Sequence, residues 1–132
     1  EYGALILAEA GLKRLGLSDR IAYRFSPEEL VPAAGQGILA IQTRAGEYAD
    51  LLARLNSPDG ALCAKTERQL ASLLGGDCSA PVGCHAQLHG TDMTLYGFSG
   101  IGGVPRYGSV QGNRNDADLL VQQLASKLTI TE

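Results

Sequence analysis

The sequence predicts an α+β fold, in which a small antiparallel sheet of about three strands carries helices packed on one face. Two segments between Glu47 and Gly76 repeat apolar residues at helical spacing. Two later segments alternate like strands around the turn Gly90-Thr91-Asp92, and a last helical pattern closes the chain. Helices followed by a run of neighbouring strands are typical of this class. An α/β remnant of upstream domains is expected to precede it.

Residues 1–44 are predicted to be the carboxy-terminal remnant of those upstream domains. The uninterrupted apolar run Ala4–Ala8 has the length of a strand, and such a run needs cover on both faces and neighbours on both edges. The chain begins without methionine and lacks evident neighbours for the run, so we expect a fragment of a longer protein. A short helix start or a dimer contact would also explain the run.

Four further elements are predicted in this remnant. Ser26, Pro27 and Glu29 form the pattern of a capping box with proline at the first helical position. The predicted elements are a helix over Glu9–Leu17, a strand over Ile21–Phe25, a compact helix starting at Ser26 and a strand over Ile38–Thr43.

Residues 45–132 are predicted to form the α+β domain, because the pattern changes after Ala45-Gly46 to long amphipathic helices. The first helix covers Glu47–Asn56, and Ser57-Pro58 ends it and caps a second helix that finishes at Gly75-Gly76. Strands are predicted over 85–89, 93–99 and 106–111, and a final helix over 116–128. The inward face of that final helix is predicted to comprise Ala117, Leu120, Leu124 and Leu128.

Composition narrows the functional classes. The net charge is −3 and the pI is near 5.3, and the basic residues are scattered. Nucleic-acid binding needs a concentrated basic surface, so nucleic acid is not expected as a partner. A membrane is not expected either, since no stretch approaches the roughly 20 apolar residues of a spanning helix. Three cysteines without a framework spacing favour a reducing, cytoplasmic or organellar compartment.

Cys78 is the principal candidate for chemistry. It lies in a glycine-rich loop, Gly75-Gly76-Asp77-Cys78-Ser79-Ala80-Pro81-Val82-Gly83, directly after a predicted helix. Glycines let the backbone leave the helix and let a bulky group approach. The carboxy-terminal end of a helix and Asp77 are both negative, so neither would favour the reactive thiolate. From spacing alone, the favoured interpretation is a small buried cysteine in a turn after a helix cap.

Other arrangements of the same residues remain open. Cys78, Cys84, His85 and His89 could ligate a metal, although the spacing of the cysteines is wider than zinc sites use. A Cys78–Cys84 disulfide and a cysteine–histidine nucleophilic pair are further alternatives. The histidines are also explained as ordinary strand residues.

Three ordered segments together resemble a known family. They are Ala10–Gly16 with the sequence AGLKRLG, the Pro32–Gly37 loop with the sequence PAAGQG, and the loop that carries Cys78. The chain resembles the carboxy-terminal part of porphobilinogen deaminases, also called hydroxymethylbilane synthases. Each motif alone is weak, whereas three in order are specific.

The resemblance implies an activity and a cofactor. Enzymes of this family condense four porphobilinogen molecules into hydroxymethylbilane, release ammonia at each addition, and serve haem biosynthesis. A dipyrromethane primer is joined to one cysteine by a thioether, and Cys78 matches that cysteine. The partners implied are porphobilinogen, the growing oligopyrrole chain and the upstream domains of the same protein. The full-length enzyme is expected to be a cytoplasmic monomer without a metal.

The resemblance also assigns site residues. Arg14 matches an arginine that faces the catalytic cleft, where fixed cations bind the acetate and propionate groups of pyrroles. Gln36 matches a residue that contacts pyrrole rings, although alone it would indicate only a surface turn. Glu67 and Arg68 match positions near the cysteine and are expected to be structural or rim residues. Asp77 departs from the family pattern, which has glycine there, and puts the reactivity of the thiol in doubt.

The 132-residue chain alone is expected to lack synthase activity, because the catalytic aspartate and most pyrrole-binding arginines of the family precede it. Two alternatives remain at this stage. The chain could be a non-catalytic α+β module that binds an anionic ligand or a partner chain, with a merely structural Cys78. A thiol redox or metal protein is the other alternative.

Overall fold

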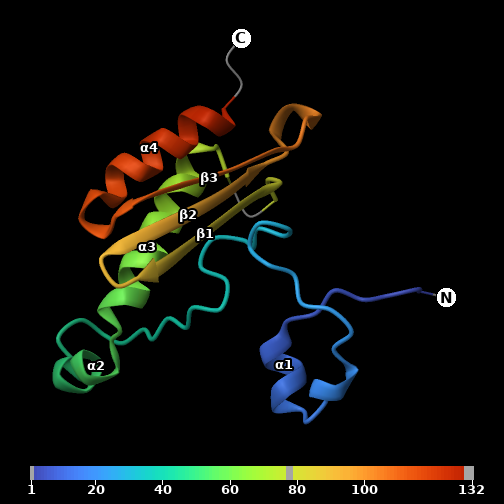
Figure 1. Cartoon of the computed structure of the whole chain (residues 1–132). Coiled ribbons are helices and arrows are strands. Elements are labelled where there is room, and N and C mark those ends of the chain that lie inside the picture. Colours follow the sequence, from blue (N-terminus) through green and yellow to red (C-terminus); the bar gives the residue numbers. More distant parts are fainter. Residues whose placement is uncertain (1, 77–78, 130–132) are drawn as a thin grey trace.

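A three-stranded antiparallel sheet organises the carboxy-terminal half of the chain in the computed structural model, which describes residues 2–76 and 79–129. Its strands are β1 (Val82–His89), β2 (Asp92–Ser99) and β3 (Arg106–Asn113), in the order β1-β2-β3. The helices α3 (Pro58–Leu73) and α4 (Ala117–Leu128) lie side by side on one face of this sheet (Figure 1). The predicted α+β class is therefore confirmed.

The strands are joined in simple meander order. The two-residue turn Gly90-Thr91 connects β1 to β2, with Gly90 at a φ of 63°, in the left-handed region that favours glycine. The register pairs Cys84 with Gly97 and Leu95 with Val110. Because side chains alternate along a strand, these four residues share the face that the helices cover. The core between the two layers includes the fully buried Leu70, Met93, Leu95, Leu124 and Leu128.

Three glycines of the sheet let α4 lie close to it. A Cβ on Gly97 would lie 2.5 Å from Leu128 Cδ1, and a Cβ on Gly112 would lie 2.9 Å from Leu120 Cδ2. A Cβ on Gly108 would be 3.2 Å from a methyl group of Leu124. The leucines of α4 thus occupy the space that side chains on the strands would otherwise fill.

Local signals explain the ends of α3. The Ser57 hydroxyl accepts a hydrogen bond from the Gly60 amide at 3.1 Å, as expected of an N-cap. At the other end, Gly76 N–H donates to Ala71 O at 2.8 Å and Gly75 N–H donates to Ser72 O at 3.1 Å. With Gly75 at a φ of 74°, these bonds form a Schellman motif. The predicted helix end at Gly75-Gly76 is confirmed.

The amino-terminal half contains short helices and much extended chain. Its helices are α1 (Glu9–Arg14), the 3₁₀ turn η1 (Ser18–Arg20) and α2 (Ala49–Leu55). The helix predicted over Glu9–Leu17 ends at Arg14, because Gly16 takes a φ of 70° and Leu17 N–H donates back to Leu12 O at 2.9 Å. In Figure 1, α1 and the described residues before it lie apart from the sheet.

The strands predicted over Ala4–Ala8, Ile21–Phe25 and Ile38–Thr43 do not form in the described chain, and neither does the compact helix at Ser26. A strand needs a hydrogen-bonded neighbour, and no described segment pairs with these runs. Their apolar side chains are left in solvent, with Ile6 72% and Leu39 85% exposed. Ser26–Glu29 forms a single turn, in which the Ser26 amide donates to Glu29 Oε2 at 2.8 Å. None of the helices among the described residues is both long and apolar enough to cross a bilayer.

Candidate functional site

Cys78 and its neighbour Asp77 lie outside the described residues, but both flanks of their loop are defined. On the helix side the chain is fixed by the Schellman end of α3. On the strand side, Pro81 O accepts a hydrogen bond from the Gly100 amide at 2.8 Å. A Cβ on Gly76 would lie only 2.6 Å from Val82 Cγ2, so the two flanks pack directly against each other. The two ends of the cysteine loop therefore lie next to each other in the fold.

The helix-side flank is exposed and lies next to Ile101, a residue that Arg106 binds. Gly75 is exposed, and the nearest atom to a Cβ placed there would be Ile101 Cδ1, at 3.9 Å. Arg106, at the start of β3, donates from Nη1 to the Ile101 carbonyl at 3.4 Å. Ile101 thus contacts this flank through its side chain and binds through its carbonyl a guanidinium, a group that suits carboxylates.

Gln36 lies at the tip of an exposed turn between two glycines in left-handed conformation. Gly35 has a φ of 77° and Gly37 a φ of 84°. The turn is held by Gln36 N–H donating to Ala33 O at 3.0 Å and Ile38 N–H donating to Gly35 O at 3.1 Å. We call residues 33–37 the Gln36 loop. The side chain of Gln36 is exposed, so its amide is available to a ligand.

A buried carboxylate ties the Gln36 loop to the α+β domain. Glu67, on α3, is 2% exposed. Its Oε2 accepts from Gly35 N–H at 2.7 Å, and its Oε1 accepts from Ala86 N–H of β1 at 2.8 Å. His85 Nδ1 lies 3.3 Å from the same Oε1. Burial of a carboxylate is unfavourable without such partners, and here both oxygens are used.

A second contact docks the same segment. Pro32 O accepts from Cys84 N–H at 2.8 Å, and a Cβ on Gly83 would lie 2.6 Å from Val31 O. The free edge of β1 is thereby satisfied at Cys84 by a carbonyl and at Ala86 by Glu67.

The buried position of Glu67 contradicts a place on the rim and gives this residue a structural role. The sequence contained a usable signal for the burial of Glu67. Cys63, Glu67, Leu70 and Leu74 recur at helical spacing, which places the glutamate in line with residues that pack on the core.

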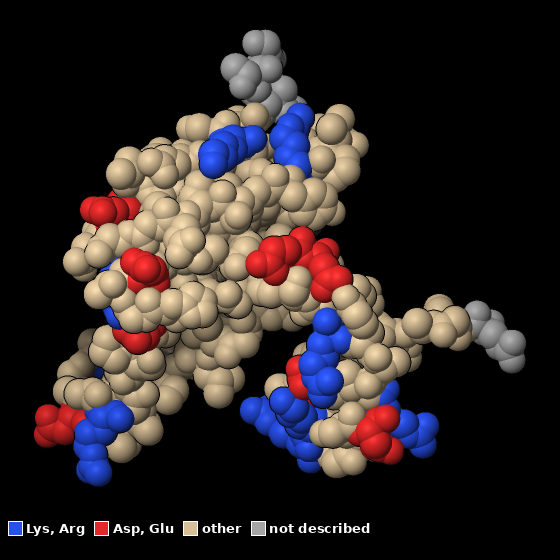
Figure 2. Space-filling model, viewed as in Figure 1, with Lys and Arg blue, Asp and Glu red and all other residues tan. Residues whose placement is uncertain are grey.

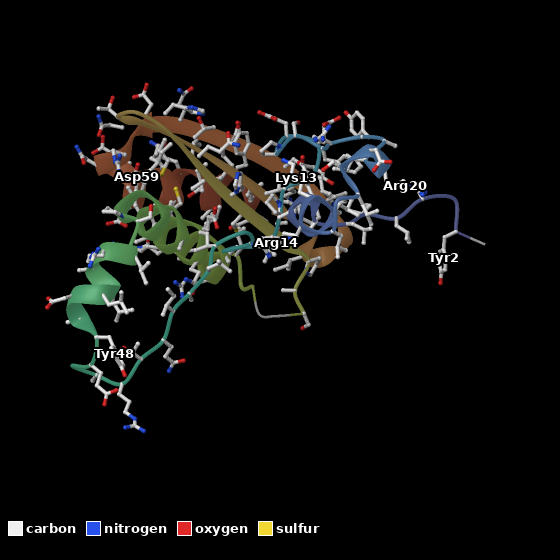
Figure 3. All side chains as sticks on the ribbon, turned by 90° about the horizontal axis from the view of Figure 1, so that it is seen from below. Tyr2, Lys13, Arg14, Arg20, Tyr48 and Asp59 are labelled. Atoms are coloured by element: carbon white, nitrogen blue, oxygen red, sulfur yellow. The ribbon has the colours of Figure 1, made fainter. Side chains whose placement is uncertain are left out.

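Arg14 lies elsewhere, on the last turn of α1, and is exposed. The ion pairs of this region are made around it: Glu9 Oε1 lies 2.9 Å from Lys13 Nζ and 2.8 Å from Arg24 Nε. Among the described residues, the guanidinium of Arg14 has neither ion pair nor hydrogen bond. Basic side chains gather around α1 in Figure 2, and Figure 3 labels Lys13, Arg14 and Arg20 in this part of the chain. No hydrogen bond or ion pair between described residues joins Arg14 to the Gln36 loop.

The two described thiols, those of Cys63 and Cys84, are unsuited to nucleophilic chemistry. Burial, together with the negative charge of Glu67, raises the pKa of Cys84 from 9.0 to about 12. Burial also raises the pKa of Cys63. Neither thiol will ionise appreciably near neutral pH.

The geometry of β1 also separates the proposed metal ligands. Cys84 faces the core, whereas His85 and His89 project from the opposite face, and His85 stacks on Tyr96 with ring centroids 6.4 Å apart. In the described ranges, no three cysteine, histidine or acidic side chains gather as a metal site.

Comparison with known proteins identifies the family. Residues 1–51 match the family described as "Porphobilinogen deaminase, dipyromethane cofactor binding domain", and residues 61–129 match "Porphobilinogen deaminase, C-terminal domain". The porphobilinogen deaminases of Chromobacterium violaceum, Methylobacillus flagellatus and Thiobacillus denitrificans are 46%, 44% and 42% identical to the chain. Each alignment covers 97% of this chain but 43% of the relative, so the chain spans less than half of their length. The chain therefore belongs to the porphobilinogen deaminase family.

Proposed function

We propose that the chain is the carboxy-terminal portion of a porphobilinogen deaminase, which condenses four porphobilinogen molecules into hydroxymethylbilane with loss of ammonia. The observation that carries this proposal is the ordered match of two family domains along one chain, at residues 1–51 and 61–129. A non-catalytic module would not need the Gln36 loop and the cysteine loop to be attached to the same helix. Here α3 binds the first loop through Glu67 and leads directly into the second.

Cys78 is the proposed thioether anchor of a dipyrromethane cofactor. The surroundings of its loop are compatible with such a group, because a Cβ at Gly75 would meet only Ile101 Cδ1 within 4 Å, and Arg106, whose guanidinium suits carboxylates, donates to the carbonyl of the same Ile101. When bound, the cofactor supplies a covalently held primer for chain growth. The family domain matched by residues 1–51 is named for binding this cofactor, whereas Cys78 lies within the other match. A group anchored at Cys78 would thus contact both parts of the chain, which agrees with the docking of the Gln36 loop.

Gln36 and Arg14 are the proposed substrate-handling residues. The exposed amide of Gln36 can donate to and accept from pyrrole substituents, while its loop is fixed on the domain. Arg14 keeps its charge at any working pH, and its planar guanidinium can hold a carboxylate through two parallel hydrogen bonds. Both residues would orient the substrate next to the anchored chain, so that each reacting carbon meets the next at short range.

The rest of the enzyme is proposed to come from upstream sequence. Residues 1–44 would complete domains whose other strands cover the exposed apolar runs Ala4–Ala8 and Ile38–Thr43. Residues 45–132 would form the carboxy-terminal domain. The full-length enzyme is proposed to be a cytoplasmic monomer. The 132-residue chain alone is expected to form no hydroxymethylbilane, and measurable production by the purified chain would contradict this.

The test is an intact mass of the full-length protein and of its Cys78→Ala variant, together with an acid colour test for pyrroles. A two-pyrrole adduct is expected on the parent and not on Cys78→Ala. Cys63→Ala, which removes a half-buried thiol, is the matched control and should keep the adduct. Unmodified parent protein, even after incubation with porphobilinogen, would refute the anchor and favour a binding module.

A further inference from the structure

We propose that Glu67 is a positioning residue of the enzyme: its buried carboxylate fixes the Gln36 loop to the helix that leads into the cysteine loop. This inference rests on the proposed function. It assigns to Glu67 a role in catalysis that acts through Gln36 and involves no contact with substrate.

The first argument is the way the carboxylate is used. Its two oxygens accept backbone N–H groups from two different segments, Gly35 at 2.7 Å and Ala86 at 2.8 Å. Hydrogen bonds to an ionised acceptor are about twice as strong as neutral ones, and burial excludes competing water. A carboxylate that bridges two segments in this way fixes one relative to the other.

The second argument is the place of the bridge. Gly35 directly precedes Gln36, and the turn that presents Gln36 is closed by Ile38 N–H donating to the Gly35 carbonyl at 3.1 Å. The peptide groups on both sides of Gly35 are therefore engaged, one by Glu67 and one by the turn. The position of Gly35 sets the direction in which the Gln36 side chain leaves the loop.

The third argument separates positioning from general stability. The segment has an independent anchor, because Pro32 O accepts from Cys84 N–H at 2.8 Å. Loss of the Glu67 bridge should leave the segment attached at Pro32 and release mainly residues 33–37. The core of the domain is built from residues of α3, α4 and the sheet, and of residues 33–37 only Ala34 packs against it.

Glu67→Gln is the discriminating variant. A glutamine has the shape of glutamate, but one of its two terminal atoms is an NH₂ donor. In either orientation this NH₂ faces a backbone N–H, that of Gly35 or that of Ala86, so one side of the bridge is lost. Glu29→Gln is the matched control, because Glu29 also accepts a backbone N–H, that of Ser26 at 2.8 Å, but at an exposed turn.

The experiment uses the full-length enzyme and four readouts: cofactor loading by intact mass, kcat and KM for porphobilinogen, thermal unfolding, and amide hydrogen exchange of residues 33–37. For Glu67→Gln we expect full loading, a nearly unchanged KM and kcat lowered by about 10- to 100-fold. Exchange of the Gly35 amide should accelerate. Glu29→Gln should match the parent enzyme in kcat.

Two results would overturn the proposal. One is a kcat close to that of the parent although the Gly35 amide exchanges faster, and the other is a lower kcat without faster exchange. If Glu67→Gln fails to fold, Glu67→Asp decides, because it keeps the buried carboxylate but is one methylene group too short to reach both the Gly35 and the Ala86 amides. It should then lower kcat, and an unaltered kcat with faster exchange of the Gly35 amide would equally overturn the proposal. A parent enzyme that carries no cofactor and forms no hydroxymethylbilane would instead refute the proposed function.

Discussion

Replacement of Gly83 by alanine should detach the segment before the Gln36 loop from β1. The new Cβ would lie 2.6 Å from Val31 O and 3.2 Å from Pro32 O, and real Cβ atoms do not approach other atoms within 3.0 Å. Both obstacles are backbone atoms, which cannot rotate away as a side chain can. The 2.8 Å hydrogen bond from Cys84 N–H to Pro32 O must therefore stretch or break. A buried donor without its partner costs about 1–3 kcal/mol.

Amide hydrogen exchange of Cys84 in the full-length protein is the direct assay. A loss of about 2 kcal/mol corresponds to exchange that is roughly 30-fold faster at this amide. Gly11→Ala is the control for a generic glycine replacement, because a Cβ there meets no other residue within 4 Å. A Cys84 amide in Gly83→Ala that stays as protected as in the parent would show that the segment is not held at β1 in the way described.

Two further outcomes follow from the core. The pKa of Cys84 is raised in the folded state from 9.0 to about 12, so the stability that its neutral thiol contributes is present below pH 9 and is lost as pH rises towards 12. The free energy of unfolding, measured with urea, should fall less between about pH 8 and pH 10.5 in Cys84→Ala than in the parent, by about 2 kcal/mol. An equal fall in both proteins would contradict the raised pKa of Cys84. Gly97→Ala places a Cβ 2.5 Å from Leu128 Cδ1 and should destabilise the domain by about 1–3 kcal/mol, measured by the same unfolding curves. A stability equal to that of the parent would mean that α4 can move away from the sheet without loss.

The sequence predicted the α+β half of the fold well because its signals are local. Ser57 caps α3, Gly75 ends it in a Schellman motif, and alternation with a Gly90-Thr91 turn defines β1 and β2. The strands expected in the first half depend on partners distant in sequence. Apolar runs such as Ala4–Ala8 carry the composition of a strand, but composition cannot supply the hydrogen-bonded neighbour. These segments therefore appear as extended chain with exposed apolar side chains.

The candidate site was predictable to a different degree at each residue. The motif around Gln36 identified the loop, and the structure adds that Gly35 and Gly37 form its left-handed corners. The role of Glu67 could not be derived in the same way, because its two partners are 32 and 19 residues away along the chain. Cys78 lies outside the described residues, and the roles of Cys78, Arg14 and Gln36 stay predictions.

The helix α3 also fixes the distance between Glu67, which binds the Gln36 loop, and the start of the cysteine loop. From Glu67 to the last helical residue, Leu73, the axial rise is roughly 9 Å, at about 1.5 Å per residue. This spacing is set by the geometry of the helix and does not change when domains move. The bridge to Gly35 and the first residues of the cysteine loop therefore form one rigid frame. If the enzyme lengthens its product by one pyrrole at a time, the growing chain must move past this frame, since the frame itself cannot lengthen.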